Sequence, residues 1–309
     1  MISLDAYTIR RTPLITGFIL WLLLFAGKIP FSPYANEQVH ILLLAAPLFL
    51  LPSFLYLKGY TKESLLRVLI AAALFSLAFQ VPKGALGALL VIPWLLVALY
   101  EVWQSWRYDL ELSLMSITAL AANIFWLVAA AWAIPDRLGY SPLDYDPVII
   151  LLTVVHFHYA GYILLQLYLL GKPYWTKAYG RFVGILLLIG MPMVAIGISA
   201  TQVGLPVMIE SLTVTIMALG GIGVGLGYLH MAWKEKKVIT MLLWMISGLC
   251  LLVGMSLAML YGWRFHHDYQ WLSIPWMYAV HGTFNSMGFA LFGLAGWLVN
   301  QRKGIESTA

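Results

Sequence analysis

Residues 147–170 read PVIILLTVVHFHYAGYILLQLYLL, an apolar stretch long enough to cross the hydrocarbon core of a bilayer, which requires about 20 residues of helix. Two histidines, His156 and His158, lie inside the stretch beside Tyr159 and Tyr162. A histidine at membrane depth finds no water for its ring nitrogens, so it marks a candidate functional site. The stretch therefore predicts a membrane fold that carries polar groups in its interior.

The composition of the whole chain agrees with this prediction. Hydrophobic residues make up 62% of the 309 residues and charged residues 10%, against roughly 45–50% and about 25% in a soluble domain. No soluble block interrupts the chain, so residues 1–309 are predicted to form a single integral-membrane helical domain. The net charge of +5 does not indicate a nucleic-acid partner, because the basic residues lie in short loops. The expected partner is the lipid bilayer, with a lipidic or small-molecule ligand.

Apolar windows predict an all-α polytopic bundle of about ten membrane spans. The windows cover residues 13–31, 38–57, 64–81, 84–104, 112–134, 147–170, 181–200, 206–232, 238–262 and 273–299. The third and fourth windows are separated only by Pro82, Lys83 and Gly84, which indicates either a hairpin turn or one broken helix. The glycine-rich run 220–227 of the eighth window predicts close packing against neighbouring helices.

The distribution of lysine and arginine predicts the orientation of these spans. With ten spans, 14 of the 18 basic residues fall on one side of the membrane and four on the other. Because cytoplasmic loops carry the excess of Lys and Arg, both termini are expected to be cytoplasmic.

Polar residues from distant spans are expected at similar membrane depth. His156 lies about nine residues into the sixth span, roughly 13 Å from its outer end at the rise of a helix. His281 lies about as deep in the tenth span, so the two rings are expected to meet in the outer half of the bilayer. Helical spacing places further polar side chains toward the bundle interior, and these complete the candidate ligand-binding set: Asn123, Gln166, Thr213, Tyr278 and Asn285. Glu101 is expected near enough to the inner edge to reach water.

The histidines are candidates for acid–base chemistry or for binding a metal. The candidate catalytic set is His156, His158, Tyr159, Glu210 and His281, and the three histidines are the candidate metal ligands. Residues i and i+2 of a regular helix point about 200° apart, so His156 and His158 cannot bind one ion together without local unwinding. A mononuclear metal ion that uses one of them with His281 stays open, and so does a haem between the same helices.

The segments 155–162 (VHFHYAGY) and 281–289 (HGTFNSMGF) resemble the YndJ-like family of bacterial multi-pass membrane proteins. The second segment is followed by Gly293, Gly296 and Trp297, which belong to the same resemblance. The resemblance implies a protein of the bacterial cytoplasmic membrane and implies no reaction.

Three functional hypotheses remain. In the first, the histidines form a metal-dependent or acid–base enzyme that acts on a lipidic or membrane-soluble substrate. In the second, the same groups line the path of a transporter for a small ligand or a proton. In the third, the protein is a structural or sensory membrane component without catalytic activity. The sequence favours the enzyme, because histidines aligned on two helices are more specific than a generic polar cavity.

Overall fold

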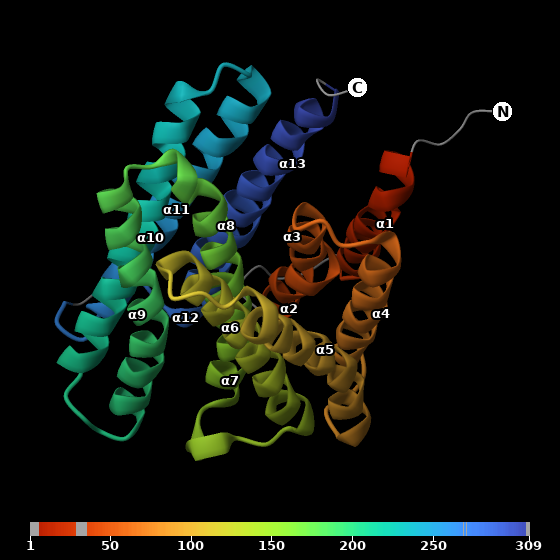
Figure 1. The fold of residues 1–309 in the computed structure, drawn as a ribbon. Helices are drawn as coiled ribbons and strands as arrows, with labels where there is room; N and C mark the ends of the chain where they lie inside the picture. Colours follow the sequence, from red (N-terminus) through yellow and green to blue (C-terminus); the bar gives the residue numbers. More distant parts are fainter. Residues whose placement is uncertain (1–5, 29–35, 268, 270, 307–309) are drawn as a thin grey trace. The chain divides into compact units, whose positions relative to one another are not determined.

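The computed structural model describes residues 6–28, 36–267, 269 and 271–306. Helices account for nearly all of this part of the chain, which contains no strand (Figure 1). Each of the ten windows predicted from hydropathy falls on a helical segment, although residues 29–31 of the first window lie outside the described ranges. The predicted all-α bundle is confirmed.

The helical segments follow one another with short connections, and η denotes the π-helical and 3-10 segments. They are α1 (Ala6–Ala26), α2 (Asn36–Ala45), η1 (Ala46–Leu50), α3 (Leu51–Leu57), α4 (Lys62–Ala78), α5 (Ala85–Gln104), η2 (Ser105–Asp109), α6 (Leu114–Leu138), η3 (Pro142–Asp144), α7 (Pro147–His156), η4 (Phe157–Ile163), α8 (Leu164–Gly171), η5 (Lys172–Tyr174), α9 (Lys177–Gln202), α10 (Met208–Lys234), α11 (Val238–Gly262), α12 (Ile274–Thr283), η6 (Phe284–Ala290) and α13 (Leu291–Glu306).

Eight continuous helical stretches in the described ranges are long and apolar enough to cross a membrane. The other two predicted spans fall on α1, whose apolar part covers Leu14–Ala26, and on α4, which has 17 residues. The chain is therefore a multi-pass membrane protein. The number of ten spans and the cytoplasmic placement of both termini stay predictions.

The short link between the third and fourth predicted spans is a hairpin turn, not a break in one helix. Helix α4 has a defined start of its own at its other end, where the Thr61 hydroxyl caps it by accepting a hydrogen bond from the backbone N–H of Ser64. Gly84 precedes α5 with a φ of +150°, a conformation that side chains disfavour. Its N–H donates to the carbonyl of Arg137 at 2.7 Å, which ties the turn to the end of α6.

Three of the longer helices are interrupted by π-helical turns. The segment η1 contains Pro47, whose missing N–H and bulky ring disturb the regular ladder of hydrogen bonds. The segments η4 and η6 overlap the two stretches that carry the family resemblance, 155–162 and 281–289. π-helical turns are rare and occur frequently at functional sites, so these two stretches are candidates for the position of the site.

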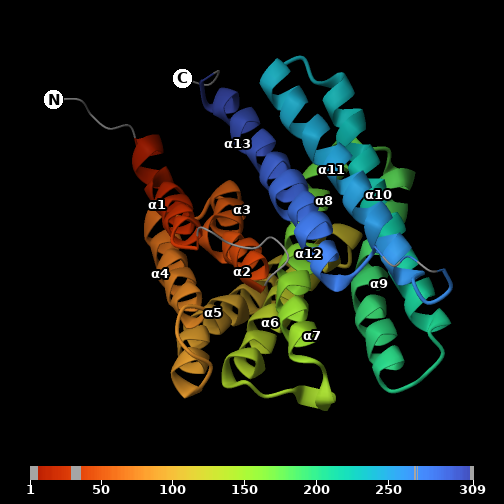
Figure 2. The ribbon, with the colours of Figure 1, turned by 180° about the vertical axis from the view of Figure 1, so that it is seen from behind.

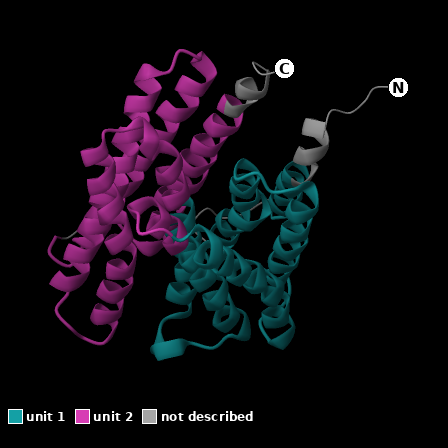
Figure 3. Ribbon diagram, in the orientation of Figure 1, with its two compact units in different colours: residues 1–110, 122–163 teal, residues 111–121, 164–309 magenta. Residues whose placement is uncertain are grey.

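The chain groups into two compact units, each described by itself (Figure 3). Unit 1 comprises residues 1–110 and 122–163, and unit 2 comprises residues 111–121 and 164–309. The chain therefore passes from one unit to the other three times: between Leu110 and Glu111 ahead of α6, within α6, and at the junction of η4 and α8. The single domain predicted for residues 1–309 stays a prediction.

In unit 2, α10 packs closely against α9 on one side and α11 on the other (Figure 1). A Cβ atom at Gly223 would lie 2.6 Å from Val183 of α9, and one at Gly221 would lie 2.5 Å from Met255 of α11. The glycine-rich run thus permits the close helix approach that the sequence predicts. Seen from behind, α12 and α13 run along α11 (Figure 2).

In unit 1, helix α5 has one exposed apolar face and one buried face that carries polar side chains. Large apolar side chains, among them Leu89, Leu96 and Leu99, are exposed on one side. Trp94, Ala98 and Glu101 are buried on the other side, at the spacing of successive helical turns. This distribution suits a helix that touches lipid outside and polar partners inside, and it defines where the candidate site lies.

Candidate functional site

The buried face of α5 is the centre of a set of polar and aromatic side chains inside unit 1, which we call the unit 1 polar cluster. Its members come from the α3–α4 loop, α5, η2, α6 and η4: Tyr60, Trp94, Glu101, Ser105, Asn123, Trp126, His158 and Tyr162. All except Tyr60 are buried. Of these eight, the sequence predicted only Asn123 and His158 as site residues.

Glu101 is the acidic member of the cluster, and its side chain is shielded from solvent. The residue is only 3% exposed, so the expectation that Glu101 reaches water is wrong. The Tyr60 hydroxyl donates a hydrogen bond of 2.7 Å to its Oε1. Among the described residues, no cation lies within 4 Å of this carboxyl group, since the three ion pairs of this part of the chain involve other acids. Lys58 lies within electrostatic range of Glu101 without forming such an ion pair.

Burial, and secondly the charge of Glu101, raise the pKa of Tyr60 far above its ordinary value. Tyr60 therefore keeps its proton and acts as a donor to Glu101 throughout the physiological pH range. An ionised carboxylate costs far more to bury without a cation than a neutral carboxylic acid does. The arrangement consequently suits a group that takes up and releases a proton.

Asn123 of α6 extends the cluster from Glu101. Its Nδ2 donates to the Ser105 hydroxyl at 2.7 Å and to the backbone carbonyl of Glu101 at 3.3 Å. In the part of the chain that the structure describes, its Oδ1 has no hydrogen-bond partner, and neither has the Trp126 Nε1 nor the Tyr162 hydroxyl. The rings of Trp126 and Tyr162 meet edge to face at 5.2 Å, and Tyr162 lies within electrostatic range of Glu101. Three fully buried polar groups are thus available to a bound polar species.

His158 closes the opposite end of the cluster from Tyr60. Its Nδ1 lies 2.8 Å from the Val154 carbonyl and can only donate to it, which leaves Nε2 as the acceptor for the Trp94 indole N–H at 3.1 Å. Both ring nitrogens are therefore engaged, and the ring is neutral with its proton on Nδ1. His158 holds α7–η4 against α5 in this structure.

His156 and Tyr159 diverge from His158. His156 is exposed, and its Nδ1 donates to the Leu152 carbonyl at 2.6 Å, whereas His158 is fully buried. The π-helical turn that starts at Phe157 does not bring the two rings onto one face, in agreement with the separation predicted from helical geometry. The Tyr159 hydroxyl donates to the Leu42 carbonyl at 2.6 Å and so joins η4 to α2.

In unit 2, His281 and Asn285 form a second polar site between α11 and α12–η6. The His281 Nδ1 donates to the Gly254 carbonyl at 2.8 Å, and the Asn285 Nδ2 donates to the His281 carbonyl at 3.0 Å. A Cβ atom at Gly254 would lie 2.5 Å from the Asn285 Oδ1, so a larger residue there would displace the Asn285 amide. The sequence predicted both residues, and the structure brings them together within one helix turn.

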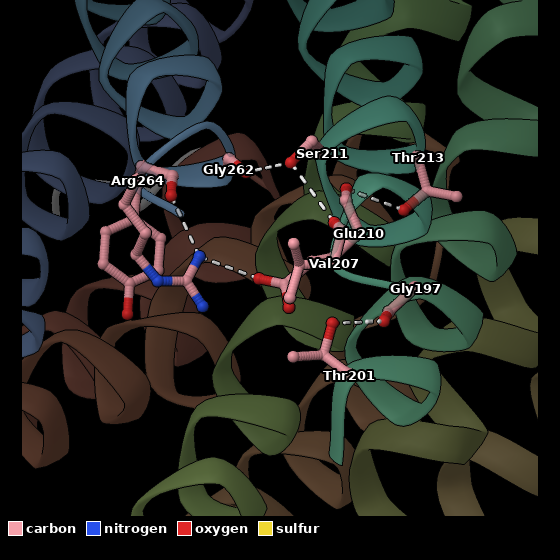
Figure 4. Close-up of polar contacts among 9 residues, drawn as sticks. Gly197, Thr201, Val207, Glu210, Ser211, Thr213, Gly262 and Arg264 are labelled. Carbon is pink, nitrogen blue, oxygen red and sulfur yellow. Dashed lines mark hydrogen bonds and ion pairs between the residues drawn. The ribbon is translucent and has the colours of Figure 1, made fainter. Parts of the chain in front are cut away.

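Glu210 and Thr213 belong to a third site, at the end of unit 2 where α10 begins and α11 ends (Figure 4). The Arg264 guanidinium points at the Glu210 carboxylate, with 2.8 Å between Nη1 and Oε1. The Ser211 hydroxyl donates to the Gly262 carbonyl at 2.7 Å beside it. The Thr213 hydroxyl donates to the Glu210 carbonyl at 3.0 Å. Glu210 is therefore bound to an arginine and joins two helices.

The remaining predicted residues also lie in unit 2. Gln166 is buried in α8 and its Nε2 has no hydrogen-bond partner among the described residues, while Tyr278 is partly exposed on α12. In the ranges that the structure describes, no three His, Cys, Asp or Glu side chains gather closely enough to hold a metal ion. His156 and His158 lie in unit 1 and His281 lies in unit 2, so their pairing at a metal ion or a haem stays a prediction.

Six members of the unit 1 polar cluster were missed from the sequence. The available signal was Glu101, one of only two acidic residues in the apolar windows, together with its helical spacing from Trp94. Tyr60 lies in a loop, and no pattern in the sequence links it to a residue 41 positions away.

The fold and its buried polar groups define a multi-pass helical membrane protein. The sequence profile of the YndJ-like protein family matches residues 40–289, so the chain belongs to this family. A curated relative, the "Uncharacterized membrane protein YndJ" of Bacillus subtilis (strain 168), is 25% identical over 271 residues. The match covers 80% of this chain and 44% of the relative, so the chain spans less than half of the relative's length. No solved structure matches the chain.

Proposed function

We propose that the protein is a proton-coupled membrane transporter in which Glu101 is the proton-binding residue. The observation that carries the proposal is the Glu101 carboxyl, which is 3% exposed inside an apolar helix and is hydrogen-bonded to Tyr60, with Lys58 near but not in a direct ion pair. Ionisable side chains in membrane helices occur at proton relays and at the paths of transported ions.

The neighbours of Glu101 support a proton path through the cluster. Tyr60 donates from the α3–α4 loop and orients one carboxyl oxygen. On the opposite side, Asn123 Oδ1 and the Tyr162 hydroxyl offer buried acceptors that no other group uses in the described structure. A proton taken up by Glu101 neutralises its charge, and its release restores the carboxylate.

The test uses the full chain in vesicles that contain a pH-sensitive dye, with a potassium diffusion potential as the driving force. We expect Glu101→Gln to slow proton uptake by about a hundredfold, the size of effect that a positioned proton-transfer group produces. The matched control is Glu111→Gln, because Glu111 is an exposed acid outside the cluster. Tyr60→Phe, which removes only the hydroxyl, is expected to give an intermediate rate.

Infrared spectroscopy of the same samples supplies a readout that does not depend on transport. The carbonyl band of a protonated carboxylic acid is expected in the wild type and absent in Glu101→Gln. Wild-type vesicles that take up protons no faster than empty ones would overturn the transport proposal. Equal rates for the wild type and Glu101→Gln would instead exclude Glu101 as the proton-binding residue.

The metal-dependent enzyme favoured by the sequence remains a separate hypothesis that rests on His156, His158 and His281. It predicts a stoichiometric metal ion in the purified protein that is lost in His281→Ala. Elemental analysis and a visible spectrum, which reports haem, test it directly. The structure gives greater support to the proton-binding site, because both ring nitrogens of His158 already form hydrogen bonds with neighbours within unit 1.

A further inference from the structure

A groove on the outside of unit 1 lies between α5 and α6, close to the hairpin turn that precedes α5. It has a volume of about 250 Å³ and is lined only by apolar residues: Ala85, Ala88, Leu89, Ile92, Ile134 and Leu138. Both helices are long and apolar enough to cross the membrane. Ala85 and Ala88 leave the space, because larger side chains at these positions would fill it.

Charged residues stand at the end of the groove nearest the turn. Lys83 Nζ lies 3.2 Å from Asp136 Oδ1, and Arg137 Nε lies 3.0 Å from Asp136 Oδ2. Two cations and one anion leave this group with a net charge of +1. Its position is fixed by the hydrogen bond from the Gly84 N–H to the Arg137 carbonyl, which joins the turn to α6.

The two cations differ in what they can reach. Arg137 is buried, and its Nη1 donates to the Ala78 carbonyl at 3.0 Å while its guanidinium stacks on the Phe79 ring. The side chain of Lys83 is 45% exposed. The unbalanced positive charge is therefore presented by Lys83, directly beside the start of the apolar groove.

We propose that this groove holds one acyl chain of an anionic phospholipid whose phosphate group contacts the Lys83 ammonium. A groove with a wholly apolar lining on two membrane helices is reached by lipid chains and has no polar group to hold a hydrophilic ligand. The net positive charge at its end selects a negatively charged headgroup over a zwitterionic one. The inference is independent of the function proposed for Glu101.

The experiment measures the Tm of the detergent-solubilised full-length protein with added phosphatidylglycerol or phosphatidylcholine. The quantity compared is the difference between the two lipids within each variant, so that a variant's own loss of stability cancels. We expect phosphatidylglycerol to raise the Tm of the wild type more than phosphatidylcholine does. In Lys83→Gln this difference disappears, whereas the control Lys236→Gln, an exposed lysine of unit 2, keeps it.

A second variant tests the groove itself. Ala85 is exposed, so Ala85→Phe is compatible with folding and places a ring across the groove. It is expected to remove the stabilisation by both lipids. The proposal is overturned if Lys83→Gln keeps the preference for phosphatidylglycerol, or if Ala85→Phe retains the stabilisation seen in the wild type.

Discussion

At the scale of single residues, the two buried glutamates inside the apolar windows have different partners. Glu101 in unit 1 accepts a hydrogen bond from Tyr60, while Glu210 in unit 2 is neutralised by Arg264 at 2.8 Å. Arg264 is further held by the rings of Tyr261 and Phe265, each 4.0 Å from its guanidinium carbon. A buried acid in a direct ion pair favours a structural role, whereas Glu101, whose cation Lys58 lies beyond ion-pair distance, favours a role in which the acid titrates.

The first prediction concerns this pair. Arg264→Gln leaves the Glu210 carboxylate buried without its cation. Breaking a fully buried ion pair costs about 3–5 kcal/mol of folding stability. We expect a smaller loss here, because the Arg264 side chain is 25% exposed. The double variant Glu210→Gln with Arg264→Gln removes both charges and should recover part of the loss. The single thiol, Cys250, packs close to Gly288, so its reaction with a fluorescent maleimide reports unfolding. A loss in the double variant equal to the sum of the losses in the single variants Arg264→Gln and Glu210→Gln would contradict direct coupling.

At the scale of helices, π-helical turns coincide with side chains that bond to backbone carbonyls. His158 donates to Val154 just before η4, and Asn285 donates to the His281 carbonyl within η6. In the membrane interior every backbone carbonyl needs a donor, and a π-helical turn disturbs the regular ladder that supplies one. The polar residues of the two family segments therefore have a structural task in addition to any chemical one.

The second prediction concerns the packing of η4 against α6. A Cβ atom at Gly161 would lie 2.7 Å from the Cβ of Phe125, which cannot retreat without moving the backbone of α6. Gly161→Ala should therefore destabilise unit 1 by about 1–3 kcal/mol, the typical cost of overpacking. Unfolding in SDS followed by circular dichroism measures it. Gly27→Ala is the control, because a Cβ atom there makes only ordinary contacts; similar losses in both variants would refute a specific contact with Phe125.

At the scale of the whole molecule, hydropathy alone predicted the class of fold and the position of all ten helical segments. The long apolar windows leave a helix as the only structure that satisfies the backbone in lipid. The polar cluster was harder to predict, because it depends on which faces of α5, α6 and η4 meet. Regular helical spacing would place Tyr159 and Gln166, three and ten residues after His156, on the same face as His156. The π-helical turn changes the helical phase after His156, and Tyr159 and Gln166 are buried whereas His156 is exposed.

The third prediction tests whether α4, one of the two helices by which ten predicted spans exceed the eight long apolar stretches, crosses the membrane. Helix α4 has 17 residues, about 25 Å at 1.5 Å per residue, which is short for a hydrocarbon core of about 30 Å. If α4 nevertheless crosses, Lys62 and Lys83 lie on opposite sides of the membrane. Single cysteines in a Cys250→Ala background, introduced as Lys62→Cys, Lys83→Cys and Tyr140→Cys, are labelled in intact cells with a membrane-impermeant maleimide.

The expected result is labelling from outside at Lys83 and Tyr140 but not at Lys62. Lys83 and Tyr140 serve as an internal control, because they are expected on the same side of the membrane. Helices α5 and α6 between them are both long enough to cross, and the Gly84 N–H reaches the Arg137 carbonyl at the end of α6. Lys236→Cys, in the basic loop between α10 and α11, should behave like Lys62 under the positive-inside rule. Labelling of Lys62 together with Lys83 would mean that α4 does not cross, and the fold would then carry a short helical hairpin arm ahead of α5. The basic residues of the α3–α4 loop would in that case lie on the outer side, and the excess of positive charge that fixed the predicted orientation would shrink accordingly.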